Sequence, residues 1–250
     1  MKIVRITNHK ITIQGQDIHY RTAGNGRPLI LIHGLSGSTR WWKKNIGFLA
    51  KHYKLHLIDL PGFGGMSRFR GRLALNKVSS WLVELLLELG VKKADFIGHS
   101  MGGYICIKIA AQNPQILRRL VLVSSVGISP GKTIINSFLP LLLALRYARP
   151  TFLPILATDA MRAGPLTLYQ SVREVLCADI TKEIRCIKAP TLLVWGEKDS
   201  LVPAKCATIF NKKIKNSKLF VLKGAGHVPM YDTPHEFNQA IHAFLESKRT

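Results

Sequence analysis

Six short runs of apolar residues recur along this 250-residue chain, and segments long enough to form helices separate them. Runs this short and almost entirely apolar are typical of strands that are buried on both faces of a parallel sheet. The alternation predicts right-handed crossovers and helices on both faces of one sheet, which is a three-layer α/β architecture. The runs cover residues 29–32, 55–58, 96–97, 120–123, 192–195 and 219–222.

The amino-terminal region adds two strands of a different kind. Residues 10–20 alternate apolar and polar side chains around Gly15, which predicts an antiparallel hairpin at the edge of the sheet. The sheet is therefore predicted to have eight strands, most of them parallel. The clearest helix is predicted over residues 73–89, where leucines recur at three- and four-residue spacing before Gly90. Further helices are predicted over 100–112 and 234–245.

One region interrupts this alternation. Residues 127–187 contain no convincing buried strand, and five prolines lie among their apolar segments. This pattern predicts a helical cap inserted after the sixth strand, with residues 1–126 and 188–250 forming the core. No internal repeat or low-complexity tract is present, so a solenoid is not expected.

The chain is strongly basic, with 36 Lys and Arg residues against 14 Asp and Glu residues and a formal net charge of +22. Because 47% of the residues are apolar, the chain has enough material for one core, and a charged disordered chain is excluded. A field of this sign attracts phosphates, acidic proteins and anionic membrane surfaces. The basic clusters lack interleaved aromatic residues and a recognition module, so no nucleic-acid partner is expected.

The four cysteines form no C-x-x-C pair, which argues against a disulfide scaffold or a zinc site and predicts reduced, mostly buried thiols.

The first residues are polar where a signal peptide needs an apolar core. The most apolar stretch, residues 138–145, contains Pro140 and is shorter than the ~20 residues of a membrane-spanning helix. We expect a cytoplasmic protein without a transmembrane segment.

The sharpest local motif is G-x-S-x-G, which runs from Gly98 through Ser100 to Gly102, directly after a predicted strand and before a predicted helix. A serine on such a turn has a strained backbone, and the two glycines let strand and helix approach closely. The amino end of the helix can stabilise an anion at the same place. The motif therefore predicts Ser100 as a nucleophile.

A serine hydroxyl needs an imidazole to take its proton and a carboxylate to orient that imidazole. Glu197 and Asp199 follow the strand predicted at 192–195, and His227 lies in a glycine-rich turn after the last strand. The chain order of nucleophile, acid and histidine matches this type of fold. Asp199 is preferred because it lies farther beyond its strand, and Glu197 remains the alternative. His99, beside the nucleophile, is expected to pack and form hydrogen bonds.

Acyl transfer also needs hydrogen-bond donors for the developing oxyanion. The geometry of the motif assigns one donor to the backbone N–H of Met101 and a second to the loop after the third strand. In that loop Leu35 is the expected donor, because Gly34 permits the turn that points its amide inward. No metal ion and no cofactor are expected in this chemistry.

Together these motifs resemble the α/β-hydrolase superfamily over essentially the whole chain. The matching pieces, in chain order, are the HG pair at 33–34, DLPGFG at 59–64, GHSMGG at 98–103, GEKDSLVP at 196–203 and GAGHVP at 224–229. The resemblance implies a cap over the site and a structural role for Asp59. Haloalkane dehalogenases and epoxide hydrolases carry a carboxylate where this chain has Ser100. Hydrolases of carbon–carbon bonds usually have Trp after the histidine, where this chain has Val228.

The expected function is therefore hydrolysis of a small carboxylic ester with a small or medium apolar acyl group, through an acyl-enzyme on Ser100. Residues 54–64 are also similar to the esterases that demethylate pimeloyl methyl esters on acyl carrier protein. Those enzymes dock an acidic carrier through arginines on the cap, so an acidic carrier protein is an alternative partner. Two further alternatives stay open, a carbon–carbon bond hydrolase of ring-fission diketones and a small-molecule receptor without turnover.

Overall fold

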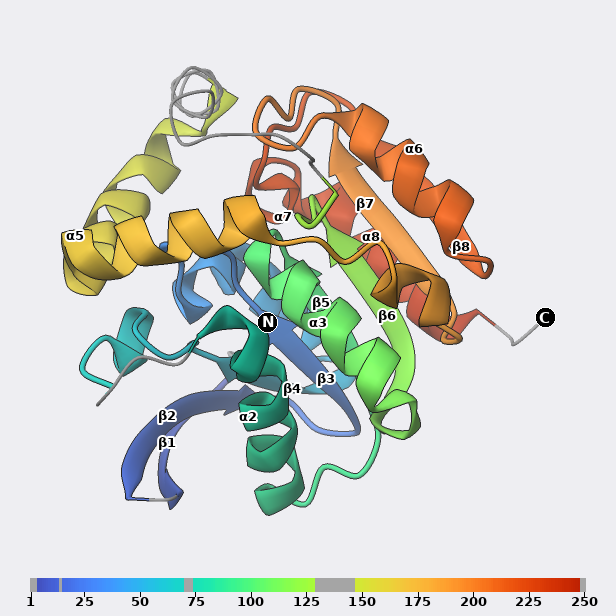
Figure 1. Ribbon diagram of the computed structural model, residues 1–250. Coiled ribbons are helices and arrows are strands. Elements are labelled where there is room, and N and C mark those ends of the chain that lie inside the picture. Colours follow the sequence, from blue (N-terminus) through green and yellow to red (C-terminus); the bar gives the residue numbers. More distant parts are fainter. Residues whose placement is uncertain (1–3, 14, 70–73, 129–146, 248–250) are drawn as a thin grey trace.

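Eight strands form a single sheet in the computed structural model, which describes residues 4–13, 15–69, 74–128 and 147–247 (Figure 1). The strands are β1 (Ile6–Ile13), β2 (Gln16–Ala23), β3 (Arg27–Ile32), β4 (Tyr53–Ile58), β5 (Ala94–His99), β6 (Leu117–Val123), β7 (Thr191–Gly196) and β8 (Ser217–Leu222). Their order across the sheet is β1-β2-β4-β3-β5-β6-β7-β8. The pairs β1–β2 and β2–β4 are antiparallel, and all other neighbours are parallel. The predicted sheet is confirmed, although the hairpin is longer than residues 10–20.

Helices cover both faces of this sheet (Figure 1). The main ones are α1 (Lys43–Leu49), α2 (Leu75–Glu88), α3 (Met101–Gln112), α5 (Leu153–Cys177), α6 (Ala204–Lys213), α7 (Pro229–Asp232) and α8 (Pro234–Glu246). Residues of α2, α3 and α6 share one hydrophobic cluster, and residues of α1 and α8 share another. In β3, Ile30 and Ile32 belong to the first cluster while Leu29 and Leu31 belong to the second, and all four are fully buried. Burial on both faces explains why the sequence of this strand is continuously apolar.

The chain leaves the sheet between β6 and β7. The described residues of this segment, 127–128 and 147–187, contain α5 and the short 3-10 helices η5 (Pro150–Phe152) and η6 (Glu183–Cys186), and no strand. Gly164, with a φ of 76°, breaks α5 into two halves just before Pro165. The apolar stretch at 138–145 lies outside the described residues. Within the described ranges, none of the helices is long and apolar enough to cross a membrane.

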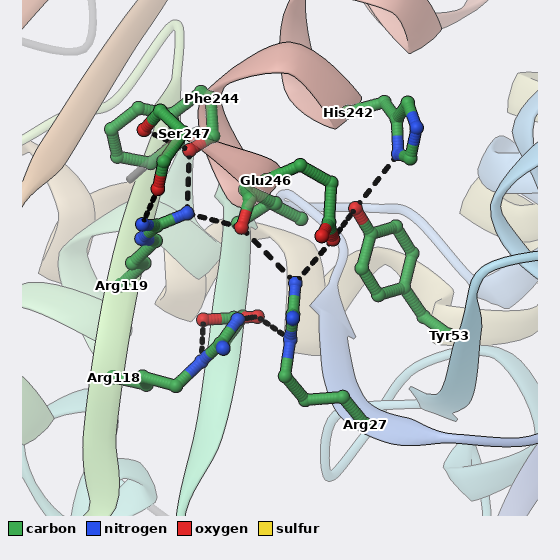
Figure 2. Close-up of polar contacts among 10 residues, drawn as sticks. Arg27, Tyr53, Arg118, Arg119, His242, Phe244, Glu246 and Ser247 are labelled. Atoms are coloured by element: carbon green, nitrogen blue, oxygen red, sulfur yellow. Dashed lines mark hydrogen bonds and ion pairs between the residues drawn. The ribbon is translucent and has the colours of Figure 1, made fainter. Parts of the chain in front are cut away.

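A polar network ties the amino ends of three parallel strands to the end of α8 (Figure 2). The buried carboxylate of Asp95 on β5 pairs with Arg27 on β3, at 3.2 Å, and with Arg118 on β6. Arg27 also pairs with Glu246 at 2.6 Å, and Arg119 donates to backbone carbonyls at the end of α8. This network lies at the amino ends of the strands, so it leaves the carboxyl ends free for the site.

Candidate active site

Ser100 lies between the end of β5 and the start of α3, with a φ of 51° and a ψ of −114°. A positive φ is strained for a residue other than glycine, and such strain is typical of functional sites. A Cβ atom on Gly98 would lie 2.5 Å from the carbonyl oxygen of Gly102, and one on Gly102 would lie 2.5 Å from that of Ile32. Both glycines are therefore required for the close approach of strand and helix.

The structure brings Ser100, His227 and Asp199 together from the segments that follow β5, β8 and β7. Ser100 Oγ lies 3.2 Å from His227 Nε2. His227 Nδ1 lies 3.0 Å and 3.1 Å from the two carboxylate oxygens of Asp199. Because an ionised carboxylate only accepts, His227 donates from Nδ1, and its Nε2 can accept the hydroxyl proton of Ser100. The three side chains thus form one directed chain of hydrogen bonds.

Asp199, and not Glu197, is the carboxylate beside His227. One oxygen of Asp199 also accepts the backbone N–H groups of Leu201 and Val202, at 3.0 Å and 2.9 Å, which fix the carboxylate in place. Glu197 is exposed, and its carboxylate accepts the N–H of Gly224 at 3.0 Å. Glu197 therefore supports the turn that precedes His227 without contacting the imidazole.

Two buried side chains hold the backbone around His227. His99 donates from Nε2 to the carbonyl oxygen of His227 at 2.8 Å, because that oxygen can only accept. Burial lowers the pKa of His99 well below its ordinary value, with a smaller effect from nearby His227, so the ring is neutral. Asp232 accepts the N–H of Gly226 at 2.9 Å, one residue before the histidine. The loop is thus supported from the nucleophile turn and from α7.

The loop after β3 lies directly against the nucleophile turn. A Cβ atom on Gly34 would lie 2.7 Å from His99 Nδ1 and 3.1 Å from Ser100 Cβ. His33 donates from Nδ1 to the carbonyl of Gly34 at 2.7 Å and accepts the N–H of Leu60 at Nε2, at 2.9 Å. Burial lowers the pKa of His33 and so favours the neutral ring, in which Nδ1 donates and Nε2 accepts. Leu35 follows this anchored glycine in the chain.

Asp59, at the end of β4, holds two neighbouring turns together. Its carboxylate accepts the N–H of Thr39 at 2.6 Å and the N–H of Gly65 at 2.8 Å. A Cβ atom on Gly64 would lie 2.6 Å from the carboxyl carbon of Asp59. Asp59 is thus enclosed by backbone, as a structural residue would be.

Sequence reasoning missed Asp159 of α5. Asp159 is fully buried and accepts hydrogen bonds from Ser38 Oγ at 2.7 Å, Trp41 Nε1 at 3.1 Å and Arg40 Nη2 at 2.5 Å. It therefore ties α5 to the loop that carries Leu35. The only signal in the sequence is a lone carboxylate within the otherwise apolar stretch LPILATDAM.

A small hollow of about 30 Å³ lies beside the nucleophile turn. The apolar residues around it include Leu60, Phe63 and Met101, while α5 contributes the polar side chains of Ser171 and Glu174. Such a lining suits an apolar group with few polar contacts. Across the described ranges, no group of three or more His, Cys, Asp or Glu side chains could hold a metal ion.

The model of the alpha/beta hydrolase family matches residues 29–240. The chain belongs to this family. One relative of this hydrolase is the pimeloyl-[acyl-carrier protein] methyl ester esterase of Yersinia enterocolitica, 27% identical, with 94% of this chain and 100% of that one covered. Another is an uncharacterized protein of Mycobacterium tuberculosis, 25% identical, with 94% and 80% covered.

Among solved structures, a membrane phospholipase A described as a bacterial virulence factor superposes with a TM-score of 0.83 at 23% sequence identity. The match covers 96% of this chain and 86% of that one. At this identity the likeness shows the shared fold. Hydrolase membership and the esterase relative together support an enzyme.

Proposed function

We propose that this hydrolase cleaves carboxylic esters with Ser100 as nucleophile, His227 as general base and Asp199 as the group that orients His227. The observation that carries the proposal is the unbroken series of contacts from Ser100 Oγ through His227 to Asp199, at 3.2 Å and 3.0 Å. The esterase relative supports the same reaction class. The apolar side chains of Leu60, Phe63 and Met101 beside the hollow favour a small or medium apolar acyl group.

In the first half of the proposed reaction, Ser100 Oγ attacks the ester carbonyl carbon while His227 Nε2 takes the hydroxyl proton. The tetrahedral intermediate collapses, His227 returns that proton to the leaving alcohol, and the acyl group stays on Ser100. In the second half, His227 takes a proton from water, whose oxygen attacks the acyl carbon. The protonated His227 then restores the Ser100 hydroxyl as the acid leaves, so the net change is one ester and one water converted to acid and alcohol.

The oxyanion donors in this proposal are the backbone N–H groups of Leu35 and Met101. Met101 is the first residue of α3, so its amide has no partner four residues earlier within the helix. Gly34, the residue before Leu35, lies against the nucleophile turn. Residues 127–187 are proposed as the cap over the site, with residues 1–126 and 188–250 as the core. The anchoring of α5 through Asp159 supports that role.

The direct test is Ser100→Ala, assayed with p-nitrophenyl esters of increasing acyl length. We expect turnover to fall by about 10⁴-fold or more, because the remaining groups only bind and polarise the ester. Circular dichroism should show an unchanged fold. Near-normal turnover by the variant would refute the proposed nucleophile. A wild-type protein that releases one equivalent of alcohol and then stops would instead be a receptor.

A second candidate substrate is an ester carried by acyl carrier protein. The relative from Yersinia enterocolitica is named for that substrate and aligns over its whole length. The net charge of +22 suits a strongly acidic carrier. In this version the chemistry at Ser100 is the same, and only the partner that delivers the ester differs.

The proposed compartment is the cytoplasm. All four cysteines are free thiols, as in a reducing environment. Cys106 and Cys206 are buried, whereas Cys177 and Cys186 are exposed, so the expectation of mostly buried thiols holds for two of the four.

A further inference from the structure

Helix α5 turns apolar side chains toward solvent. Five of the ten large hydrophobic side chains exposed in the described part of the chain fall within residues 147–169. On α5 itself the exposed fractions are 39% for Leu153, 75% for Met161, 67% for Leu166 and 57% for Tyr169. Figure 1 shows the two halves of this helix meeting in a bend at the outer edge of the molecule. A clustered apolar surface of this kind is typical of an interaction site.

The charges of α5 are divided between its two sides. Its two carboxylates are both engaged by the core, since Asp159 is bound by the loop after β3 and Glu174 accepts the N–H of Leu75 at 2.8 Å. The two basic residues, Arg162 and Arg173, are exposed. The outer face of α5 is defined here as its exposed large apolar and basic residues, which lie on both sides of the bend at Gly164 and include no carboxylate: Leu153, Met161, Arg162, Leu166, Tyr169 and Arg173.

The charge of the whole molecule limits what can cover this face. The formal net charge is +22, so the electrostatic field around the molecule is strongly positive and attracts an anionic partner. Two copies of the face would bring arginines together and repel each other. An anionic lipid surface offers both an apolar layer for the exposed side chains and negative charge for the arginines.

We propose that the outer face of α5 docks on the surface of an anionic lipid bilayer. The inner side of the same helix lines the hollow beside Met101 through Ser171 and Glu174. Docking would hold that hollow close to the lipid headgroups. The inference rests on exposure and charge, and it does not depend on the proposed ester chemistry.

The test measures partition of the full chain onto vesicles of phosphatidylcholine mixed with phosphatidylglycerol, compared with pure phosphatidylcholine. We expect binding to the anionic vesicles that weakens at high salt. Replacing Met161, Leu166 and Tyr169 together by serine should lower the partition coefficient about a hundredfold. The pair Arg162→Gln and Arg173→Gln should lower it about thirtyfold. Hydrolysis of a soluble p-nitrophenyl ester should stay unchanged in both variants.

Matched controls separate this face from the general basic charge. Leu87→Ser removes a leucine that is 57% exposed on α2, and Lys212→Gln with Lys215→Gln removes two exposed charges near α6. Both controls should bind vesicles nearly as well as the wild type. Equal losses in controls and α5 variants, or no binding by the wild type, would overturn the proposal. Two other results would also overturn it, provided that the α5 variants abolish them. One is self-association of the wild type, and the other is binding of purified acyl carrier protein by a wild type that does not bind vesicles.

Discussion

At the scale of single residues, the candidate site depends on which carboxylate orients His227. Asp199 accepts from His227 Nδ1 and from two backbone amides, while Glu197 braces the turn at Gly224. These two acids lie two residues apart in sequence, and the sequence alone favoured Asp199 only through its distance from the strand. The hydrogen bonds supply the physical reason for that preference.

Replacing Asp199 by Asn should lower turnover of a p-nitrophenyl ester by about 10⁴-fold, because the amide N–H₂ faces His227 Nδ1 and moves the imidazole proton to Nε2. Such a histidine can no longer accept the proton of Ser100. The matched control Glu197→Gln should keep turnover close to that of the wild type. If the two variants lose activity equally, Asp199 has no special role.

The site residues were predictable where a sequence motif directly follows a predicted parallel strand. Parallel strands end at one edge of the sheet, so Ser100, Asp199 and His227 had to approach one another once the order of the strands was known. Asp159 was not predictable in this way. Its partners lie about 120 residues earlier, and no local pattern links a carboxylate in the middle of a helix to a loop after β3.

At the scale of elements, the buried carboxylate of Asp159 ties α5 to the loop after β3. We expect Asp159→Ala to destabilise the protein by about 3 kcal/mol, since it leaves the indole of Trp41, the hydroxyl of Ser38 and the partly buried Arg40 without an acceptor. Urea unfolding measures this free energy. The control Asp179→Ala, at an exposed carboxylate whose described bond is to the neighbouring Thr181, should change it far less. Equal effects would mean that Asp159 does not anchor α5.

Strands were predicted better than helices. Double burial forces continuous apolar runs in the inner parallel strands, so these strands appear in the sequence. The run at 219–222 also marks β8, but the expected burial on both faces is wrong there, because β8 lies at the edge of the sheet and Phe220 and Val221 are 40% and 41% exposed. α1 is seven residues long and contains Gly47, and α6 has only a weak apolar stripe, so neither produced a clear helical pattern. The long α5 was predicted only as separate segments, because Gly164 and Pro165 interrupt its periodicity.

At the scale of the whole molecule, buried histidines should make stability depend on pH. Burial lowers the pKa values of His33 and His99, and it lowers that of His56 on β4 to about 4. Below the ordinary value of 6.5, the unfolded chain binds protons that the folded protein excludes. The stabilisation that depends on these neutral rings is therefore fully present above about pH 6.5 and is lost as the pH falls toward 4. The pKa shift of His56 alone accounts for about 3 kcal/mol of this loss in the free energy of unfolding.

The variant His56→Leu tests this dependence, because neither ring nitrogen of His56 has a hydrogen-bond partner in the part of the chain that the structure describes. Thermal unfolding should show the variant more stable than the wild type near pH 5, with a smaller difference near pH 8. A constant difference between the two proteins at both pH values would exclude His56 as a source of acid sensitivity.

The polar network of Figure 2 also sets an order for biosynthesis. Arg27 and Asp95 leave the ribosome well before Glu246, and Arg119 finds its carbonyl partners only at the end of α8. A nascent chain that already holds β3, β5 and β6 must therefore keep these buried or half-buried charges incompletely paired until α8 has been synthesised. A chain cut before α8 would leave the guanidinium of Arg119 without these carbonyl partners, so the loss of one helix would also unpair a buried charge on β6.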